Sequence, residues 1–183
     1  VVGDEKTLLF DLAVNQEGLW DYACSLTDKP VQLVLSHGHV DHIGAVNFFK
    51  RMFGTKIYLG ALDAKMFREH PELALVQEST DYMDELFVPD VEIHEGDKIK
   101  FGNTEVEFHE APGHTEGVIS CFFDVTDGKE TKRVGYYGGF GFNTLQKSFL
   151  LEIGDTNYSM RETYLRSIEK VINEKVDIFM PNH

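Results

Sequence analysis

The sequence predicts a single domain over residues 1–183 of the α/β (α+β) class, with packed sheets and helices outside. Three observations support this prediction. A length of 183 residues suits one domain of ordinary size. The content of 42% hydrophobic and 26% charged residues suits a packed core. Short β-rich runs and helical patterns are interspersed along the chain. The apolar opening at Val1 and the abrupt end at His183 leave open that the natural chain is longer at both ends.

The first third of the chain alternates between apolar runs of strand length and helical patterns. Strands are expected over residues 7–14, 31–35 and 56–59. Helices are expected over residues 16–26 and 43–53, and Gly54 ends the second of them, as glycine often does at a helix C-terminus.

Residues 61–87 form the longest segment without strand character. We expect this segment to be mostly helical and to break at His70-Pro71, because proline suits the first turn of a new helix. Its apolar side chains are interpreted as core residues in the first place and as a substrate lid in the second.

From residue 91 the pattern changes to short β runs. The expected strands span residues 91–94, 98–101, 104–109, 117–126, 131–137 and 176–180. Asp127-Gly128 predicts a hairpin turn between the fourth and fifth of these strands. Residues 161–173 are expected to form a helix, because their apolar residues fall on one side.

Charge and cysteine content restrict the classes of partner and compartment. Seventeen basic against thirty-one acidic residues give a net charge of −14, which disfavours nucleic acid and anionic lipid. No apolar run is long enough to span a membrane, so no membrane partner is expected. Cys24 and Cys121 lack CxxC spacing and are both expected to be buried apolar residues. This favours a cytoplasmic location; secretion or a periplasmic location stays open if a signal segment precedes Val1.

The segment His37-Gly38-His39-Val40-Asp41-His42 follows a buried strand and holds three of the eight histidines. The C-terminal end of such a strand directs side chains into a crevice where ligands commonly bind. Imidazole nitrogens are good zinc ligands, and aspartate adds an oxygen donor. A simpler interpretation is that Asp41 only caps a helix starting near residue 43, but capping needs one polar side chain and not four. The pattern therefore predicts a metal site.

This segment resembles the HxHxDH signature of the metallo-β-lactamase fold superfamily, whose fold is an αββα sandwich of two mixed sheets. Three further segments are similar to motifs of that family: Leu8-Leu9-Phe10-Asp11, Ala111-Pro112-Gly113-His114-Thr115-Glu116-Gly117 and Met180-Pro181-Asn182-His183. The resemblance implies a first zinc site formed by His37, His39 and His114. It implies a second zinc site with contributions from Asp41, His42 and His183. Two zinc ions are thus the expected cofactors.

One departure from the family pattern bears on the substrate. Glyoxalase II-like thioesterases and lactonases of the family supply a metal-bridging Asp after a late strand, where this sequence has Gly139. Asp155 lies sixteen positions later and is expected to be a loop carboxylate. The pattern is closest to the β-lactamase subclass whose second zinc uses one Asp and two His. The segment 138–143 is either a plain turn or a functional loop in which Asn143 hydrogen-bonds the substrate.

The resemblance implies a zinc-dependent hydrolase acting on a small-molecule carbonyl, with a β-lactam-like cyclic amide favoured. Zinc lowers the pKa of bound water to about 7, and Asp41 would be the catalytic residue that orients the resulting hydroxide. Ser36 lacks the GxSxG context of a serine hydrolase. Lactone or thioester hydrolysis, iron-dependent redox chemistry and metal binding without turnover remain alternatives. His39 counts against the redox members, which usually place Glu there. The oligomeric state is left open.

Overall fold

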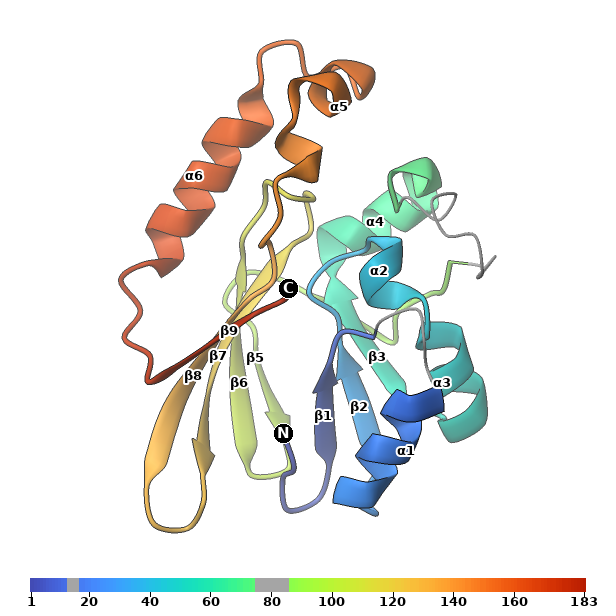
Figure 1. The fold of residues 1–183 in the computed structure, drawn as a ribbon, viewed down its shortest axis with the longest axis vertical. Coiled ribbons are helices and arrows are strands. Elements are labelled where there is room, and N and C mark those ends of the chain that lie inside the picture. The colour runs from blue at the N-terminus through green and yellow to red at the C-terminus, as the bar shows by residue number, and fades with distance from the viewer. Residues whose placement is uncertain (13–16, 75–85) are drawn as a thin grey trace.

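The structure is a computed structural model that describes residues 1–12, 17–74 and 86–183. In these residues a four-stranded sheet, ordered β1-β2-β3-β4, faces a five-stranded sheet, ordered β5-β6-β7-β8-β9. Helices lie on the outer side of each sheet (Figure 1). The expected αββα sandwich is confirmed.

The first sheet is parallel throughout. Its strands are β1 (Thr7–Phe10), β2 (Val31–Val34), β3 (Lys56–Gly60) and β4 (Val91–Ile93). Parallel neighbours need crossover connections, which usually contain helices. The crossovers hold α1 (Glu17–Leu26), α2 (Val40–Ile43), α3 (Val46–Phe53), α4 (Ala61–Glu69) and the 3₁₀ helix η1 (Pro71–Ala74).

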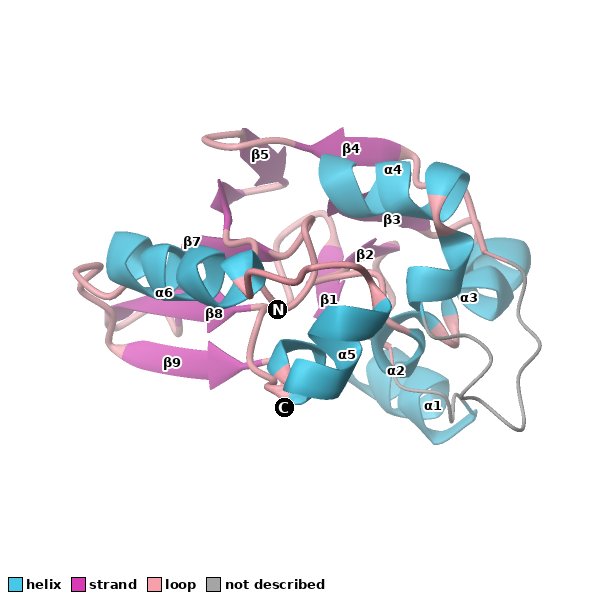
Figure 2. Ribbon diagram, turned by 90° about the horizontal axis from the view of Figure 1, so that it is seen from above, coloured by secondary structure: helices cyan, strands magenta, loops and turns pink. Residues whose placement is uncertain are grey.

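The second sheet is antiparallel except at its last pair. Its strands are β5 (Lys98–Phe101), β6 (Thr104–Glu110), β7 (Ile119–Thr126), β8 (Thr131–Tyr137) and β9 (Ile178–Pro181). Because β9 is parallel to β8, a crossover joins them. It contains the 3₁₀ helix η3 (Asn143–Leu145), α5 (Lys147–Glu152) and α6 (Ser159–Val171). Figure 2 shows α6 beside this sheet, where its Ile168 and Val171 pack near Tyr137 of β8.

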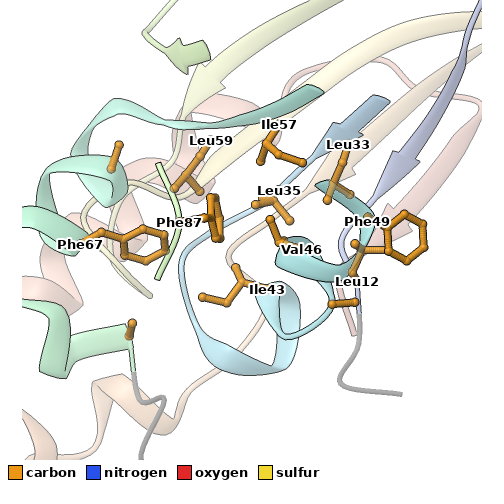
Figure 3. Packing of buried hydrophobic residues seen from close by; sticks show 13 residues of the cluster. Leu12, Leu33, Leu35, Ile43, Val46, Phe49, Ile57, Leu59, Phe67 and Phe87 are labelled. Atoms are coloured by element: carbon orange, nitrogen blue, oxygen red, sulfur yellow. The ribbon is translucent and has the colours of Figure 1, made fainter. Parts of the chain in front are cut away.

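The first sheet is buried on both faces, as parallel sheets under helices usually are. Leu33 and Ile57 face the helices, whereas Val34 and Tyr58 face the second sheet. This alternation follows from the two-residue period of a strand. The helix-side core is drawn in Figure 3, where the sheet residues meet side chains of α2, α3 and α4.

The strand directions place one set of loops at one edge of the sandwich. All strands of the first sheet end there, because they run parallel. The amide of Ile119 at the start of β7 donates to the carbonyl of Ser36 after β2, at 2.9 Å, and so joins the two sheets at this edge. Strands β6 and β8 run opposite to β7, and β9 runs with β8, so all three also end there. Loops that are far apart in sequence therefore become neighbours.

The expected strands are all present, with bounds that differ by a few residues. Strand β1 ends at Phe10 rather than continuing to residue 14, because Asp11 adopts a left-handed φ of 57°. Residues 13–16 and 75–85 lie outside the described part of the chain, so the predictions there stay untested. In the described residues 61–74, α4 and η1 are helical, and they confirm the break at His70-Pro71.

The expected helix over residues 43–53 is wrong in its first turn. The structure has α2 from Val40 and a separate α3 from Val46. Asp41 is therefore not an N-cap: it lies in the first turn of α2, whose N-cap residue is His39. The cause is tertiary, because the carbonyl of His42 accepts a hydrogen bond from the amide of Leu12 after β1, at 2.9 Å.

Further differences concern the later helices and one cysteine. The short helices η3 and α5 were not predicted. Helix α6 begins two residues earlier than expected, because the Asp155 carboxylate accepts hydrogen bonds from the amides of Ser159 and Met160. Cys121 is buried as expected, but Cys24 is exposed on α1. No helix in the described ranges is long and apolar enough to cross a bilayer.

Replacing Phe123 with Ala should lower the free energy of unfolding by about 3–5 kcal/mol. Phe123 is fully buried between the sheets and stacks on Phe10, with ring centroids 5.4 Å apart. The truncation would leave a cavity that the two sheets cannot close. Chemical denaturation measures the change. Val88→Ala is the control, because Val88 is 75% exposed and its truncation should change the free energy by less than about 0.5 kcal/mol.

Candidate metal centre

The side chains predicted to bind metal converge at the edge where the strands end. His37 and His39 lie in the loop after β2, and Asp41 and His42 lie in α2. His114 lies in the loop after β6, and His183 follows β9. The structure brings these residues into two adjoining groups.

The first group consists of His37, His39 and His114, whose nearest nitrogen atoms lie within 4.8 Å of one another. Their side chains are 0 to 3% exposed. The ring centroids are 4.6 to 4.8 Å apart. His39 Nδ1 lies 3.1 Å from His114 Nε2. Three buried imidazole rings thus face one common point.

The second group contains Asp41, His42 and His183. His42 Nε2 lies 3.2 Å from His183 Nε2, and Asp41 Oδ2 lies 3.4 and 3.7 Å from these two atoms. His37 adjoins this group as well, with ligand atoms within 4.8 Å of Asp41 and His42. Asp41 and His183 are about half exposed, so this group forms the open side of the site.

Asp11 contacts the second group at His42, on the side of the ring away from His183. Its Oδ2 lies 2.8 Å from His42 Nδ1 and accepts hydrogen bonds from Ser36 Oγ at 2.7 Å and Tyr136 Oη at 2.5 Å. Ser36 Oγ also lies 2.9 Å from His37 Nδ1. A partner at Nδ1 fixes the orientation of a ring and leaves its Nε2 facing the cluster. One carboxylate therefore orients a histidine of each group, directly for His42 and through Ser36 for His37.

His114 is held by the segment that follows β8. Thr144 Oγ1 lies 3.2 Å from His114 Nδ1. Gly141 packs so closely that a Cβ there would lie 2.9 Å from His114 Cε1. Of the two glycines Gly139 and Gly141 after β8, Gly141 therefore packs against His114 and Gly139 does not. Asn143, the predicted substrate-binding residue, is exposed and directly precedes Thr144. The sequence had not indicated a role for Thr144.

Burial makes the rings of the first group neutral. Desolvation lowers the pKa of His37 well below its usual value, that of His39 to about 3 and that of His114 to about 4. A neutral imidazole keeps a nitrogen lone pair, which is the form that binds metal. At pH 7 the group is therefore ready to accept a cation.

In the second group, contacts between charged side chains determine the pKa values. Burial lowers the pKa of His42, but hydrogen bonds to Asp11 and Asp41 outweigh it and raise the pKa to about 9. Burial raises the pKa of Asp41, but the hydrogen bond to His42 outweighs it and lowers the pKa to about 2. Asp41 is therefore a stable anion at the open side of the site.

The donor atoms suit a zinc ion. His37 Nε2 is buried and has no hydrogen-bond partner in the described ranges. A buried polar atom without a partner is unfavourable, and a cation at the common point would satisfy it. Zinc takes imidazole nitrogens, and three protein ligands leave one position open for water. Neither group contains a cysteine, or a carboxylate other than Asp41, among the described residues.

Asp63 is a residue of this region that the sequence reasoning missed. It lies in the first turn of α4, is fully buried, and accepts hydrogen bonds from both histidine-bearing loops. Burial raises its pKa to about 6, against the effect of these hydrogen bonds. Its partners lie 25 to 54 residues away in sequence, so no local pattern signals it.

A cavity of about 320 Å³ opens beside His39 and His114. Its apolar lining comes from α4, η1, the region of α5 and the start of α6: Leu62, Met66, Leu73, Phe149, Ile153 and Met160. Lys65, Glu69 and Glu116 supply charges. Such a cavity is at the small end of the range for ligand sites.

Solved structures with a similar fold are metallo-beta-lactamases. FEZ-1 from Legionella gormanii superimposes with a TM-score of 0.82 at 21% identity, covering 100% of this chain and 71% of that one. GOB-18 from Elizabethkingia meningoseptica gives a TM-score of 0.78 at 22% identity, covering 100% and 68%. At these identities the likeness shows the fold alone.

Curated relatives extend the comparison. A protein of Aquifex aeolicus is 31% identical over 129 residues, which cover 68% of this chain and 58% of the relative. Hydroxyacylglutathione hydrolase GloC of Haemophilus influenzae is 33% identical over 111 residues, covering 60% and 51%. The chain spans about half the length of these relatives.

A family model decides the classification. The model described as the metallo-beta-lactamase superfamily matches residues 25–127, which is more than half of the chain. The matched range includes the segment 37–42 and His114, and thus all three histidines of the first group. The chain belongs to the metallo-beta-lactamase superfamily.

Proposed function

We propose that the protein is a zinc-dependent hydrolase of a small-molecule carbonyl compound. The observation that carries this proposal is the first group, in which three buried, neutral imidazoles face one point. His37, His39 and His114 would hold one zinc ion. Asp41, His42 and His183 would hold a second, which would displace the proton that the raised pKa leaves on His42 at pH 7. Zinc in such a site polarises a carbonyl and makes a hydroxide nucleophile available near neutral pH.

The chain's own residues orient the reacting groups. Asp11 fixes His42 directly and His37 through Ser36, while Thr144 fixes His114. The Asp41 carboxylate, half exposed beside the histidines, would accept a hydrogen bond from the attacking water and direct its lone pair toward the substrate. Ser36 is not the nucleophile, because its hydroxyl is fully buried against Asp11 and His37.

We favour a β-lactam-like cyclic amide as the substrate. Water would add to the carbonyl carbon, the C–N bond would break, and the departing nitrogen would take up the proton that the attacking water gives up. Two features support this choice. Among the described residues, the two candidate ligand groups contain one aspartate, Asp41, and no second carboxylate. The net charge of −14 and the largely apolar cavity disfavour polyanions.

A thioester hydrolase is the second candidate. The 33% identity to a hydroxyacylglutathione hydrolase supports it. Gly139 and Gly141 count against it, because neither offers a carboxylate to two metal ions. Lactone hydrolysis and metal binding without turnover remain further alternatives.

Replacing His114 with Ala should reduce the zinc content from two ions per chain to one and lower hydrolysis by more than about 100-fold. The variant should stay folded, because Asp63 and backbone contacts still hold the loop. Elemental analysis after purification in zinc-containing, chelator-free buffer measures the ions, and circular dichroism measures the fold. His94→Ala is the control, since His94 is exposed and belongs to neither histidine group. A wild-type protein without zinc would contradict the proposed function.

Asp41→Asn should leave the protein folded and cost about 1 kcal/mol or less in stability, because Asp41 is 55% exposed, does not cap α2, and loses only its contacts with His42 and His183. The lost negative charge should lower kcat/KM by about 100-fold or more and weaken the second zinc ion. Steady-state kinetics and zinc titration give the two readouts. Asp124→Asn serves as a control for an exposed aspartate far from the site. Unchanged activity would remove Asp41 from the proposed mechanism.

The substrate class can be decided by comparing kcat/KM for a chromogenic β-lactam, a lactone and a glutathione thioester on the zinc-loaded protein. We expect the β-lactam to be preferred by tenfold or more, which is about 1.4 kcal/mol in transition-state stabilisation. The Asp41→Asn variant gives the background rate. A thioester preferred by the same margin would contradict the cyclic amide and leave the metal centre in place.

A further inference from the structure

The Asp63 carboxylate lies between the two loops that carry the first histidine group. Its Oδ2 accepts hydrogen bonds from the amide of Gly38 at 2.7 Å and from Thr115 Oγ1 at 2.8 Å. Its Oδ1 accepts a hydrogen bond from the amide of Gly117 at 2.8 Å. Gly38 stands between His37 and His39, and Thr115 follows His114. Each loop is thus held at a residue next to a predicted ligand.

Close backbone packing leaves the carboxylate no room to move. A Cβ on Gly117 would lie 2.1 Å from the Asp63 amide nitrogen, and a Cβ on Gly60 would lie 2.1 Å from the Gly117 carbonyl oxygen. On the other side, a Cβ on Gly38 would lie 2.7 Å from a ring carbon of Phe67. The start of α4 is therefore wedged between both loops, and Asp63 is 0% exposed.

The chemistry of the contact requires a carboxylate. Three donors converge on Asp63, and an ionised carboxylate has only acceptors. An asparagine would turn its amide NH₂ toward at least one of the two backbone amides, so a donor would face a donor. Asp63 forms no ion pair with a lysine, arginine or histidine among the described residues. A buried carboxylate without a cation is unfavourable unless its hydrogen bonds compensate.

We propose that Asp63 is a positioning residue that sets the distance between the loops of residues 37–42 and 111–117. It thereby fixes His37 and His39 relative to His114. This inference rests on the proposed function, because it assumes that these histidines share a zinc ion. The 3.1 Å between His39 Nδ1 and His114 Nε2 is the dimension that Asp63 controls. A small shift of one loop would misplace one ligand while the fold remained intact.

The test compares zinc binding and cobalt spectra of the wild type and Asp63→Asn. We expect the dissociation constant of the first zinc ion, measured by competition with a chromophoric chelator, to rise about 10- to 100-fold. The visible absorption of the Co²⁺-loaded variant should change, because the ligand geometry changes. Amide hydrogen exchange at Gly38 and Gly117 should be faster in the metal-free variant.

Asp155→Asn is the matched control. Asp155 also accepts hydrogen bonds from two backbone amides and one hydroxyl, those of Ser159 and Met160, but it caps α6. This variant should lose thermal stability and keep wild-type zinc affinity and cobalt spectrum. Equal effects of the two variants on zinc affinity would overturn the positioning role, since they would indicate a general loss of stability.

The remaining outcomes separate this inference from the proposed function. A folded Asp63→Asn variant with wild-type zinc affinity and spectrum overturns the role of Asp63 and leaves the zinc site intact. A wild-type protein that binds no zinc contradicts the proposed function and this inference with it. If Asp63→Asn fails to fold, Thr115→Val decides, because it removes one donor and keeps the side-chain shape. Zinc binding weakened about threefold or more supports the role, and unchanged binding overturns it.

Discussion

The rings of His37, His39 and His114 are buried against one another, and much of the structure around them serves that burial. A buried imidazole is stable only if both nitrogen atoms have partners. Ser36 and Thr144 supply partners behind His37 and His114. Two of the nitrogen atoms that face inward, His39 Nδ1 and His114 Nε2, contact each other. The third, His37 Nε2, has no partner among the described residues. This leaves the centre of the group suited to a cation.

The sandwich makes such a group possible by bringing strand ends together. A parallel sheet directs every C-terminal strand end to one edge, and the second sheet contributes the ends of β6, β8 and β9 to the same edge. Buried side chains pack against both faces of the first sheet up to these ends. The loops therefore present their side chains from a fixed frame, which suits a site that depends on distances of about 3 Å.

Three aspartates near the site differ because their environments differ. Asp11 is nearly buried and accepts hydrogen bonds that orient two histidines. Asp41 is half exposed, and its contact with His42 keeps its pKa near 2, which suits the proposed role beside the attacking water. Asp63 is fully buried without a cation and faces three donors, which suits the proposed role in spacing the loops. The same side chain is thus suited to three tasks through burial and partners alone.

Features that depend on neighbouring residues could be predicted from the amino-acid order. The apolar runs predicted the strands, and Asp127-Gly128 predicted the hairpin, because strand period and turn chemistry involve neighbouring residues. The histidine-rich segment predicted where a metal could bind, since its donors lie within six positions. The order of residues did not predict the break between α2 and α3, the exposure of Cys24, or the contacts of Thr144 and Asp63. These depend on groups that are distant in sequence, such as the donors 25 to 54 residues from Asp63, which meet only once both sheets have packed.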